Sequence, residues 1–454
     1  MPKERKKVLC MDAQRHAEYY GMQQTFDELY AKSKAGEVFN GLMELVLSPD
    51  NIMLAYRNIK TNTGSYTAGT DKQNIGDIGR LPPAEVIGKV RKIVTGSEHG
   101  YRPKPVRRKD IPKPNGKTRP LGIPCIWDRL VQQCIKQILE PICEAKFSNN
   151  SYGFRPNRSV EHAISRTYSL LQRAHLHYVL EFDIKGFFDN LDQRWLMKFL
   201  EHDIADKNFL RYISRFLKSG IVENGAILES DKGTPQGGQI SPILANVYLH
   251  YVLDLWCERI LKQYVRGEIY YVRYADDFLL MFQYEEEAKR VLELLRTRLA
   301  KFGLEVAEDK TRILPIGRFK GTKEDFDFLG FTFFNTKTRG GKYRLGVRTS
   351  KKKQKMKKQA AKAWLKTRLT KPVADTMRLI NLSLAGHYNY YGVSGNFHAI
   401  QGFYKYVKYA TYRMLNRRDQ KGKFRYTKFL RVWKYYVKEP HLTTDIWNWK
   451  PTLV

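Results

Sequence analysis

The sequence predicts an α+β fold, in which a sheet is backed by helices, followed by a strongly basic helical region. Short apolar runs typical of strands alternate with longer stretches whose apolar residues recur every three or four positions. Acidic residues become rare after position 328, where the chain changes character. At 454 residues the chain is too long for one ordinary core, so we expect two or three packed domains.

The composition favours a folded protein with a polyanionic partner. Hydrophobic residues make up 42% of the chain, enough for a large core. Lys and Arg number 80 against 46 Asp and Glu, which gives a formal net charge of +34. This excess is spread over folded sequence and not confined to one amphipathic helix, so nucleic acid is a better partner than a membrane surface. A basic protein that is merely soluble is the minor alternative.

The five cysteines indicate neither a disulfide framework nor a zinc module. Their number is odd, they form no CxxC pair, and no histidine cluster lies beside them. We also find no secretion signal and no apolar run long enough to span a membrane. These features predict a cytoplasmic, reducing environment and no membrane partner.

Three helices are predicted from apolar spacing and from residues that begin or end helices. The first is capped by Asp128 and ends at Pro141, the second opens at Ser241–Pro242, and the third runs over 285–302 and ends at Gly303.

Strands are predicted at 178–184, 269–274 and 278–282. The last two flank Ala275–Asp276–Asp277 and form a hairpin with two carboxylates at its tip, while Asp183 lies at the end of the first strand. Carboxylates among so many apolar neighbours are costly unless a cation meets them, and adjacent like charges repel. A divalent metal therefore accounts for all three aspartates. An ordinary polar turn at Asp276–Asp277 is the alternative.

Three carboxylates in this arrangement suit two Mg²⁺ ions about 4 Å apart, with Mn²⁺ as a substitute. One ion would activate a primer 3′-hydroxyl, and the other would hold a nucleoside triphosphate and its leaving group. The predicted chemistry is nucleotidyl transfer.

Tyr274–Ala275–Asp276–Asp277 is the YxDD box of reverse transcriptases, and 182–188 resembles their first catalytic motif. The resemblance implies that Asp183 and Asp276 are the main metal ligands and that Asp277 is the second acid of the box. It also implies that Phe188 is the aromatic gate that excludes a ribose 2′-hydroxyl. The expected enzyme is thus an RNA-directed DNA polymerase that uses dNTPs.

Further boxes resemble the reverse transcriptase/maturase proteins encoded by bacterial group II introns. Residues 111–124 match their fingers motif, in which Lys113 and Arg119 would bind the incoming dNTP. Residues 233–242 match the box in which Gln236 would lie beneath the nascent base pair. The glycines of this box are explained by close backbone approach.

Other positions follow from the same resemblance. Arg155, in the box 152–156, would lie near the template, and Gly330 with Phe331 would form the primer grip. Lys310 would protonate the leaving pyrophosphate, with a solvated surface lysine as the alternative.

The basic region resembles a helical thumb, or maturase, domain. From 329 to 374 there are fifteen Lys or Arg residues and no acid. The aromatic residues that follow could stack on unpaired bases, or they could be the core of a small helical domain. The predicted RNA-binding residues are Lys351, Lys352, Lys353, Lys355, Lys357 and Lys358. A solvated charged face is the alternative for this run.

The resemblance implies a right-hand polymerase with fingers, palm and a helical thumb. The predicted division is an N-terminal extension over 1–44, fingers and palm over 45–335, the thumb or maturase domain over 336–438 and a C-terminal tail over 439–454.

The implied partners are group II intron RNA, an RNA template with a DNA or RNA primer, a DNA target and dNTPs. The implied roles are reverse transcription, splicing assistance and retrohoming in the bacterial cytoplasm, at the nucleoid when DNA is the target. Many such proteins continue into an HNH endonuclease with cysteine pairs; this sequence does not, so second-strand cleavage is not expected. Two alternatives remain open: a domesticated reverse transcriptase in defence or repair, and a catalytically silent splicing factor. The oligomeric state does not follow from the sequence.

Overall fold

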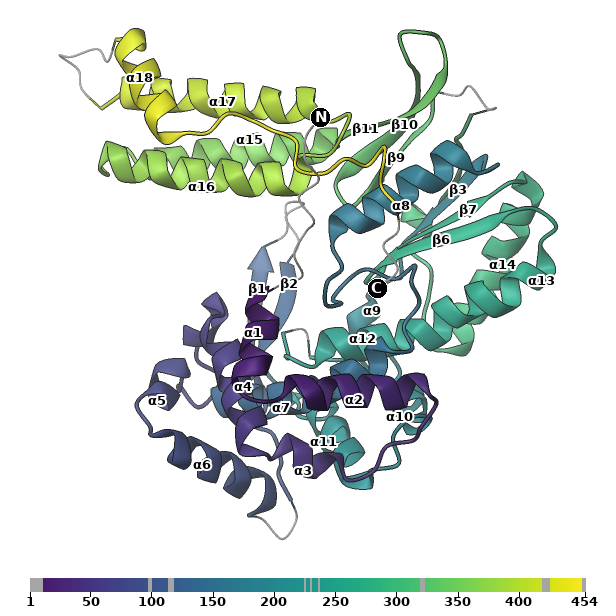
Figure 1. Cartoon of the computed structure of the whole chain (residues 1–454), viewed down its shortest axis with the longest axis vertical. Coiled ribbons are helices and arrows are strands. Elements are labelled where there is room, and N and C mark those ends of the chain that lie inside the picture. The colour runs from purple at the N-terminus through teal and green to yellow at the C-terminus, as the bar shows by residue number, and fades with distance from the viewer. Residues whose placement is uncertain are drawn as a thin grey trace. The chain divides into compact units, whose positions relative to one another are not determined.

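Helices and antiparallel strands alternate along the chain in the computed structural model, which confirms the α+β class (Figure 1). The structure describes residues 11–96, 100–112, 118–223, 226–228, 231–235, 237–318, 323–418 and 425–450. Within these ranges, no helix is both long and apolar enough to cross a membrane.

The chain forms two compact units, each assembled from three segments. The first unit comprises Met1–Arg158, Asp183–Tyr264 and Glu293–Asp309. The second comprises Ser159–Phe182, Val265–Leu292 and Lys310–Val454. This division follows compactness alone, and the predicted domain boundaries remain predictions.

The first unit is built around α7 (Ile126–Glu144), which is buried along most of its length. Asn51 ties a neighbouring helix to it, because its fully buried side-chain amide donates to the carbonyls of Val46 and Cys134 at 3.0 and 3.1 Å. The helices before α7 are α1 (Met11–Tyr19), α2 (Gln23–Lys34), α3 (Leu42–Val46), α4 (Pro49–Lys60), α5 (Ile75–Gly79) and α6 (Pro83–Thr95), with a 3-10 turn at Thr63–Tyr66.

Both predicted ends of α7 were wrong. Asp128 lies inside the first turn, where its carboxylate accepts from the Tyr101 hydroxyl and, at 3.1 Å, from the Lys104 backbone N–H. Burial raises the pKa of this carboxyl to about 6. Pro141 stands inside the helix, which ends at Glu144. Proline has no backbone N–H, so one helical hydrogen bond is lost near the C-terminal end, but the packing of the buried helix maintains it past this point.

A four-stranded sheet in the first unit has the order β2-β1-β4-β5. β1 and β2 are antiparallel, with Ile111 opposite Arg119, whereas β1 and β4 are parallel. The strands are β1 (Val106–Pro112), β2 (Thr118–Ile123), β4 (Ile221–Glu223) and β5 (Ala226–Leu228).

Further helices of the first unit begin at residues suited to that place. Asp192 and Asp206 each accept two backbone N–H groups at the starts of α10 (Gln193–Glu201) and α11 (Lys207–Leu217). α12 (Ser241–Leu249) begins at Ser241–Pro242, as predicted. The chain continues through two π-helical segments, His250–Asp254 and Trp256–Leu261, into α13 (Lys262–Tyr264). α9 is a single turn at Phe187–Asn190.

The second unit contains an antiparallel sheet of order β6-β7-β3-β8. β6 (Ile269–Tyr274) and β7 (Asp277–Phe282) are the predicted hairpin, and β3 (Tyr178–Phe182) is two residues shorter than predicted. β8 (Arg312–Pro315) completes the sheet, and α8 (Val160–Arg173) packs against β6. α14 (Glu285–Lys301) starts at the predicted residue and is followed by Gly303 with a φ of +71°. A 3-10 turn at Glu308–Lys310 precedes β8.

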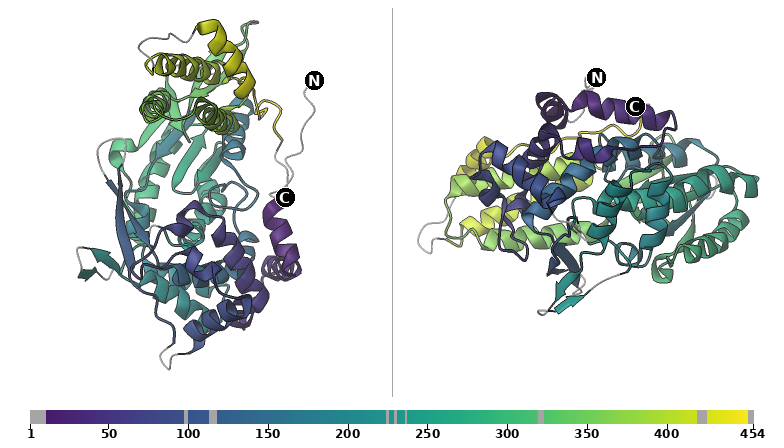
Figure 2. Two further views of the ribbon diagram at one scale, coloured as in Figure 1. Left: turned by 90° about the vertical axis from the view of Figure 1, so that its left-hand side faces the viewer. Right: turned by 90° about the horizontal axis from the view of Figure 1, so that it is seen from below.

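The basic region begins as a three-stranded antiparallel sheet and becomes helical only at Lys351. The strands are β9 (Asp325–Phe328), β10 (Phe331–Lys337) and β11 (Tyr343–Thr349), in the order β11-β10-β9. The helices are α15 (Lys351–Lys366), α16 (Val373–Tyr391), α17 (Phe397–Leu415) and α18 (Tyr426–Tyr436). Figure 2 shows α15, α16 and α17 nearly end-on as a bundle.

Part of the aromatic stretch forms the core of this bundle, and part of it is exposed. Tyr388, Tyr391 and Trp433 are almost fully buried, whereas Tyr409 and Tyr435 are exposed. The core interpretation is therefore correct for the buried rings, and the exposed rings remain for contact with a partner.

Candidate active site

The β6–β7 hairpin presents the two adjacent aspartates at its tip. Tyr274 pairs with Asp277, so Ala275 and Asp276 form a two-residue loop. Ala275 has a φ of +56°, a left-handed conformation that costs a non-glycine residue roughly 1–2 kcal/mol. Asp276 is half-buried and Asp277 is exposed. Such strain in a turn that carries two carboxylates is typical of a functional site.

Arg273 stabilises this turn, and it was not identified as a site residue from the sequence. Its side chain is fully buried, and Nη1 donates to the Ala275 carbonyl at 3.1 Å. A buried guanidinium is costly unless its donors are satisfied, so its presence inside a β-strand is not incidental. The available sequence signal was an arginine in an apolar strand, directly before the YxDD box.

Strand register places the other predicted catalytic residues at the same end of the sheet. Phe182, the last residue of β3, pairs with Phe278, and the next residue along the chain is Asp183. β8 runs antiparallel to β3 with Arg312 opposite Glu181, so the exposed Lys310, two residues before β8, also falls at this end.

The carboxylates fit a divalent metal by their chemistry, because hard oxygen donors are what Mg²⁺ prefers. In the described part of the chain, no three His, Cys, Asp or Glu side chains already form a cluster that could hold a metal ion. Mg²⁺ commonly takes one or two protein carboxylates and completes its shell with water and substrate phosphate oxygens. Asp183, Asp276 and Asp277 are the residues that would hold it.

The first catalytic motif lies against the start of the third box. The Thr234 N–H donates to the Phe188 carbonyl at 2.8 Å. Gly233 has a φ of +78°, and a Cβ at this position would lie 2.7 Å from the Phe188 carbonyl oxygen. The Phe188 ring is half-buried and meets Phe187 edge-on at 5.3 Å. A glycine is therefore required for the backbone approach that places the Phe188 segment.

The other end of the third box contacts β2 and α7. A Cβ at Gly237 would lie 2.3 Å from the Gly122 carbonyl oxygen, and the Gln239 N–H donates to the Gln132 side chain at 2.8 Å. The structure thus brings the fingers motif and this box together. Lys113, Gln236 and the side chain of Arg119 lie outside the described residues.

The predicted primer grip is a tight hairpin turn. Phe328 pairs with Phe331, and the loop residues Leu329 and Gly330 have φ values of +50° and +83°. The Phe331 side chain is fully buried, so the turn offers a primer its backbone and not this ring.

The primer-grip turn is held by the helical bundle. The Tyr390 hydroxyl donates to the Leu329 carbonyl at 2.9 Å, and its ring stacks on Phe331 with centroids 6.1 Å apart and planes 7° apart. The Ser350 N–H donates to the Gly330 carbonyl at 3.0 Å. Burial, and then the charges of neighbouring groups that include Asp277, raise the pKa of Tyr390. Tyr390 therefore links the bundle to the Leu329–Gly330 turn, close to the hairpin that carries Asp276 and Asp277.

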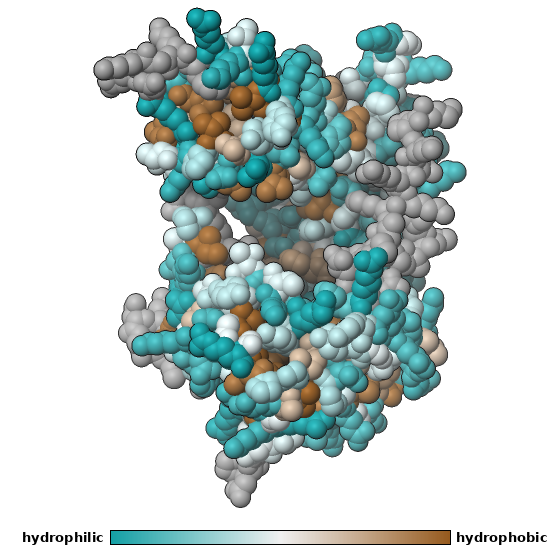
Figure 3. All heavy atoms as spheres, turned by 60° about the vertical axis from the view of Figure 1, so that its left-hand side comes forward, coloured by the Kyte–Doolittle hydropathy of each residue, from teal (hydrophilic) through white to brown (hydrophobic). Residues whose placement is uncertain are grey.

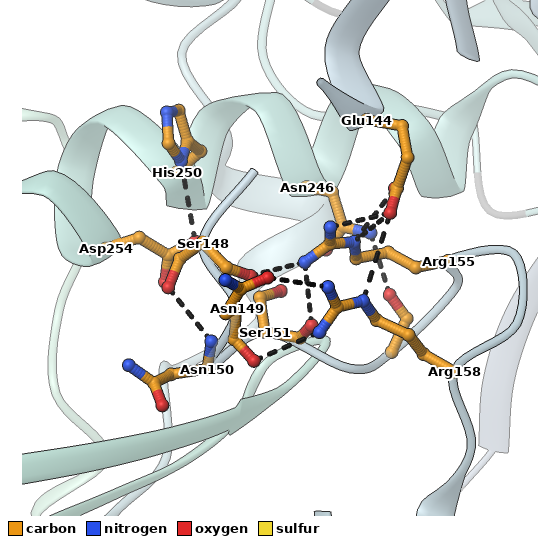
Figure 4. Close-up of polar contacts among 11 residues, drawn as sticks. Glu144, Ser148, Asn149, Asn150, Ser151, Arg155, Arg158, Asn246, His250 and Asp254 are labelled. Atoms are coloured by element: carbon orange, nitrogen blue, oxygen red, sulfur yellow. Dashed lines mark hydrogen bonds and ion pairs between the residues drawn. The ribbon is translucent and has the colours of Figure 1, made fainter. Parts of the chain in front are cut away.

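The Arg155 side chain lies in the protein interior, where it bonds other groups of the protein (Figure 4). Its side chain is 2% exposed, and it bonds the Glu144 carboxylate through Nε at 2.9 Å and Nη2 at 2.6 Å. Nη1 donates to the carbonyls of Ser148 and, at 2.8 Å, Ser151. With these donors used, Arg155 shapes the box from within, and the predicted contact between its guanidinium and a template would require these bonds to break.

The residue of this box that faces solvent is Phe154, which is 53% exposed with a φ of +57°. Asn246 of α12 fixes the preceding residue, since its side-chain amide donates to the Gly153 carbonyl at 2.8 Å. A large ring held outward on a strained backbone is better placed than Arg155 to meet a ligand.

The six predicted RNA-binding lysines lie on α15, whose start is capped by Ser350. Four of them, Lys351, Lys352, Lys353 and Lys355, are exposed. Lys357 and Lys358 are half-buried, with their ammonium groups 4.6 Å from the Tyr391 ring centroid and 5.5 Å from that of Tyr406.

Comparison with known proteins gives the family. Residues 111–333 match the family described as reverse transcriptase (RNA-dependent DNA polymerase). Protein YkfC of Escherichia coli is 32% identical over 341 residues, which are 67% of this chain and 85% of YkfC. The group II intron-encoded protein LtrA of Lactococcus lactis subsp. cremoris is 35% identical over 316 residues, 64% of this chain and 51% of LtrA. The chain belongs to the group II intron reverse transcriptase family.

Family membership confirms two predictions from the sequence, the reverse transcriptase activity and the resemblance to group II intron proteins. The match covers about half the length of LtrA. The roles of individual residues in this reverse transcriptase remain predictions.

Proposed function

We propose that this reverse transcriptase is a right-hand polymerase that extends a primer 3′-hydroxyl with dNTPs on an RNA template, using Asp183, Asp276 and Asp277 to hold two Mg²⁺ ions. The observation that carries the proposal is the sheet register, which brings the end of β3 and the tip of the β6–β7 hairpin to one edge. We assign fingers and palm to 45–335 and the thumb, or maturase domain, to 336–438.

Each group in this proposal has one task. The metal ions, when bound, activate the 3′-hydroxyl and stabilise charge on the triphosphate. Arg273 holds the Ala275 carbonyl and so fixes the turn that carries Asp276. Lys310 protonates the leaving pyrophosphate.

Substrate binding falls to other residues. The dNTP is bound by Lys113, Arg119 and Gln236, and the primer is aligned by the Leu329–Gly330 turn.

We further propose that the basic bundle binds group II intron RNA, and that the protein assists splicing and retrohoming. The support is the run of lysines on α15 and the similarity to LtrA, which is named as a group II intron-encoded protein. A domesticated reverse transcriptase would share the same chemistry. Intron RNA domains flanking the coding sequence would distinguish the two, since only the maturase needs them.

The test of the polymerase is primer extension on an RNA template with an annealed DNA primer, dNTPs and Mg²⁺. We expect extension by the wild type and none by the double variant Asp276→Ala, Asp277→Ala. A folded wild-type protein that binds RNA but does not extend the primer would overturn the polymerase and leave an RNA-binding splicing factor.

Replacing Phe188 with Ala should let the enzyme incorporate ribonucleotides. The ring is proposed to exclude the 2′-hydroxyl, and one steric contact of this size is worth about 1–3 kcal/mol, so we expect discrimination between dNTP and rNTP to fall roughly 10- to 200-fold. The measurement is the ratio of kcat/KM values for dATP and ATP.

The matched control for this variant is Phe187→Leu. Phe187 is the buried neighbour whose ring packs against Phe188, so its loss should lower activity toward both nucleotides alike. Unchanged discrimination in Phe188→Ala would contradict the gate.

Neutralising the four exposed lysines of α15 to Gln should weaken RNA binding and flatten its dependence on salt. Each phosphate that a lysine no longer neutralises lowers the slope of log K against log salt by about 0.7–0.9. Binding of a fluorescent RNA at several salt concentrations measures this slope. Gln replacements of four other exposed lysines, Lys60, Lys89, Lys92 and Lys207, serve as the control. An unchanged slope would mean that the run is only a solvated face.

A further inference from the structure

The helical bundle contains a groove of about 360 Å³ between α15, α16 and α17. Trp364 and Phe403 are aromatic members of its wall, and Ala360, Ala361 and Ser383 keep it open because their side chains are small. Volumes of this order, with mostly apolar walls and a few polar groups, are usual for sites that take a small flat ligand.

Lys357, His387 and Arg368 are polar residues in the lining of the groove. Lys357 lies on α15, whereas Arg368 lies two residues beyond the end of that helix. His387 of α16 lies beside Lys357, whose ammonium group donates to its Nδ1 at 3.1 Å. Burial and the charge of Lys357 lower the pKa of His387 to about 3, so the ring is neutral near pH 7. The Nε2 atom of this ring is buried without a hydrogen-bond partner among the described residues.

The rim of the groove is both apolar and basic. Leu379, which lines the groove, is 37% exposed, and its neighbour Leu382 is 66% exposed. In Figure 3 apolar side chains gather on the bundle within a surround of hydrophilic ones. α15 carries eight lysines and no acid, and Asp375 is the only acid from 329 to 418. This charge selects an anionic occupant and disfavours a second, equally basic copy of the chain.

We propose that this groove binds a short stretch of single-stranded RNA, with one unpaired base stacked on Trp364 and phosphates of the strand on Lys357 and Arg368. The apolar walls suit the base and the cations suit its phosphates, a combination that neither a duplex nor an acidic peptide matches as well. Arg368 lies over the Trp364 ring at 4.9 Å, and the half-buried indole is part of the groove wall, where a base could stack on it. The proposal deepens the proposed RNA-binding function and rests on it.

The test measures affinity for a short unstructured RNA and for a perfect RNA duplex, each at several salt concentrations. We expect Trp364→Ala to weaken binding of the unstructured RNA roughly 5- to 100-fold, the range for loss of one stacked base, with the salt slope unchanged because the cations that meet the phosphates remain. Duplex binding should change less than about twofold. Trp364→Phe should retain most of the affinity, and Tyr435→Ala, at an 82% exposed ring on α18, should have no effect.

Each contrary result has one meaning. Equal losses of affinity for the unstructured RNA and for the duplex, or no loss for either, would overturn the proposal. A Trp364→Ala variant that sediments differently from the wild type would also overturn it, because the groove would then be a protein interface. If Trp364→Ala unfolds at a lower temperature than the wild type, the deciding measurement is made on Trp364→Phe. This variant is photo-cross-linked to an RNA that contains 4-thiouridine. Absence of a cross-link to residues that line the groove overturns the proposal. Failure of the wild type to bind any RNA would overturn the RNA-binding function itself, whereas primer extension tests the polymerase separately.

Discussion

Replacing Asp276 with Asn should lower the rate of nucleotide incorporation about 1,000-fold, while affinity for the primer–template stays the same. Asn keeps the shape of the side chain and removes the charge that would hold the metal ion, a contribution of several kcal/mol to the transition state. Single-turnover incorporation at saturating primer–template and dNTP measures the rate, and a binding titration measures the affinity. Asp183→Asn should behave in the same way.

The matched control is Asp375→Asn on α16. Asp375 is exposed and pairs only loosely with Arg378, at 3.4 Å one turn away, so its loss should leave incorporation unchanged. Full activity in Asp276→Asn would exclude this carboxylate from the reaction. Loss of binding in step with activity would instead assign Asp276 a role in holding the nucleic acid.

The sequence predicted the β6–β7 hairpin well because the pattern that specifies a hairpin is local. Two apolar arms with a short polar turn between them permit few other structures, and β6 and β7 form within one residue of the predicted limits. The resemblance to reverse transcriptases added the order in which the motifs occur along the chain. Close backbone approach explained the glycines of residues 233–242 from the sequence, and the approach of Gly233 to the Phe188 carbonyl agrees with this explanation.

Contacts between distant positions and the burial of charged side chains could not be predicted from the sequence. Tyr390 donates to Leu329 across 61 residues, and no local pattern marks that pair. Pro141 predicts a helix end only because propensity rules ignore the packing that carries α7 past it. Arg155 resembles a ligand for the template because a sequence shows its charge and not its partners.

Replacing Arg155 with Met should destabilise the first unit by about 3–5 kcal/mol, the usual cost of breaking a buried ion pair by removing one partner. Among the described residues, Glu144, whose side chain is only 19% exposed, would keep the more distant Arg158 at 3.8 Å. The carbonyls of Ser148 and Ser151 would each lose the bond from Arg155. The shift in the urea unfolding midpoint measures the effect. Arg194→Met, at a side chain that is 90% exposed, is the control and should shift the midpoint little.

A double-mutant cycle separates the ion pair from the shape of the segment. Adding Glu144→Leu to Arg155→Met removes the uncompensated carboxylate, so part of the lost stability should return. The rest should not return, because the Ser151 carbonyl loses its bond from Arg155 and the Ser148 carbonyl keeps the Ser151 N–H at 3.2 Å but loses the guanidinium. If Arg155 instead serves mainly as a ligand for the template, Arg155→Met should unfold like the wild type and lose only template affinity. Because Arg155 follows Phe154 directly, the segment that holds this exposed ring outward should loosen as the network is lost.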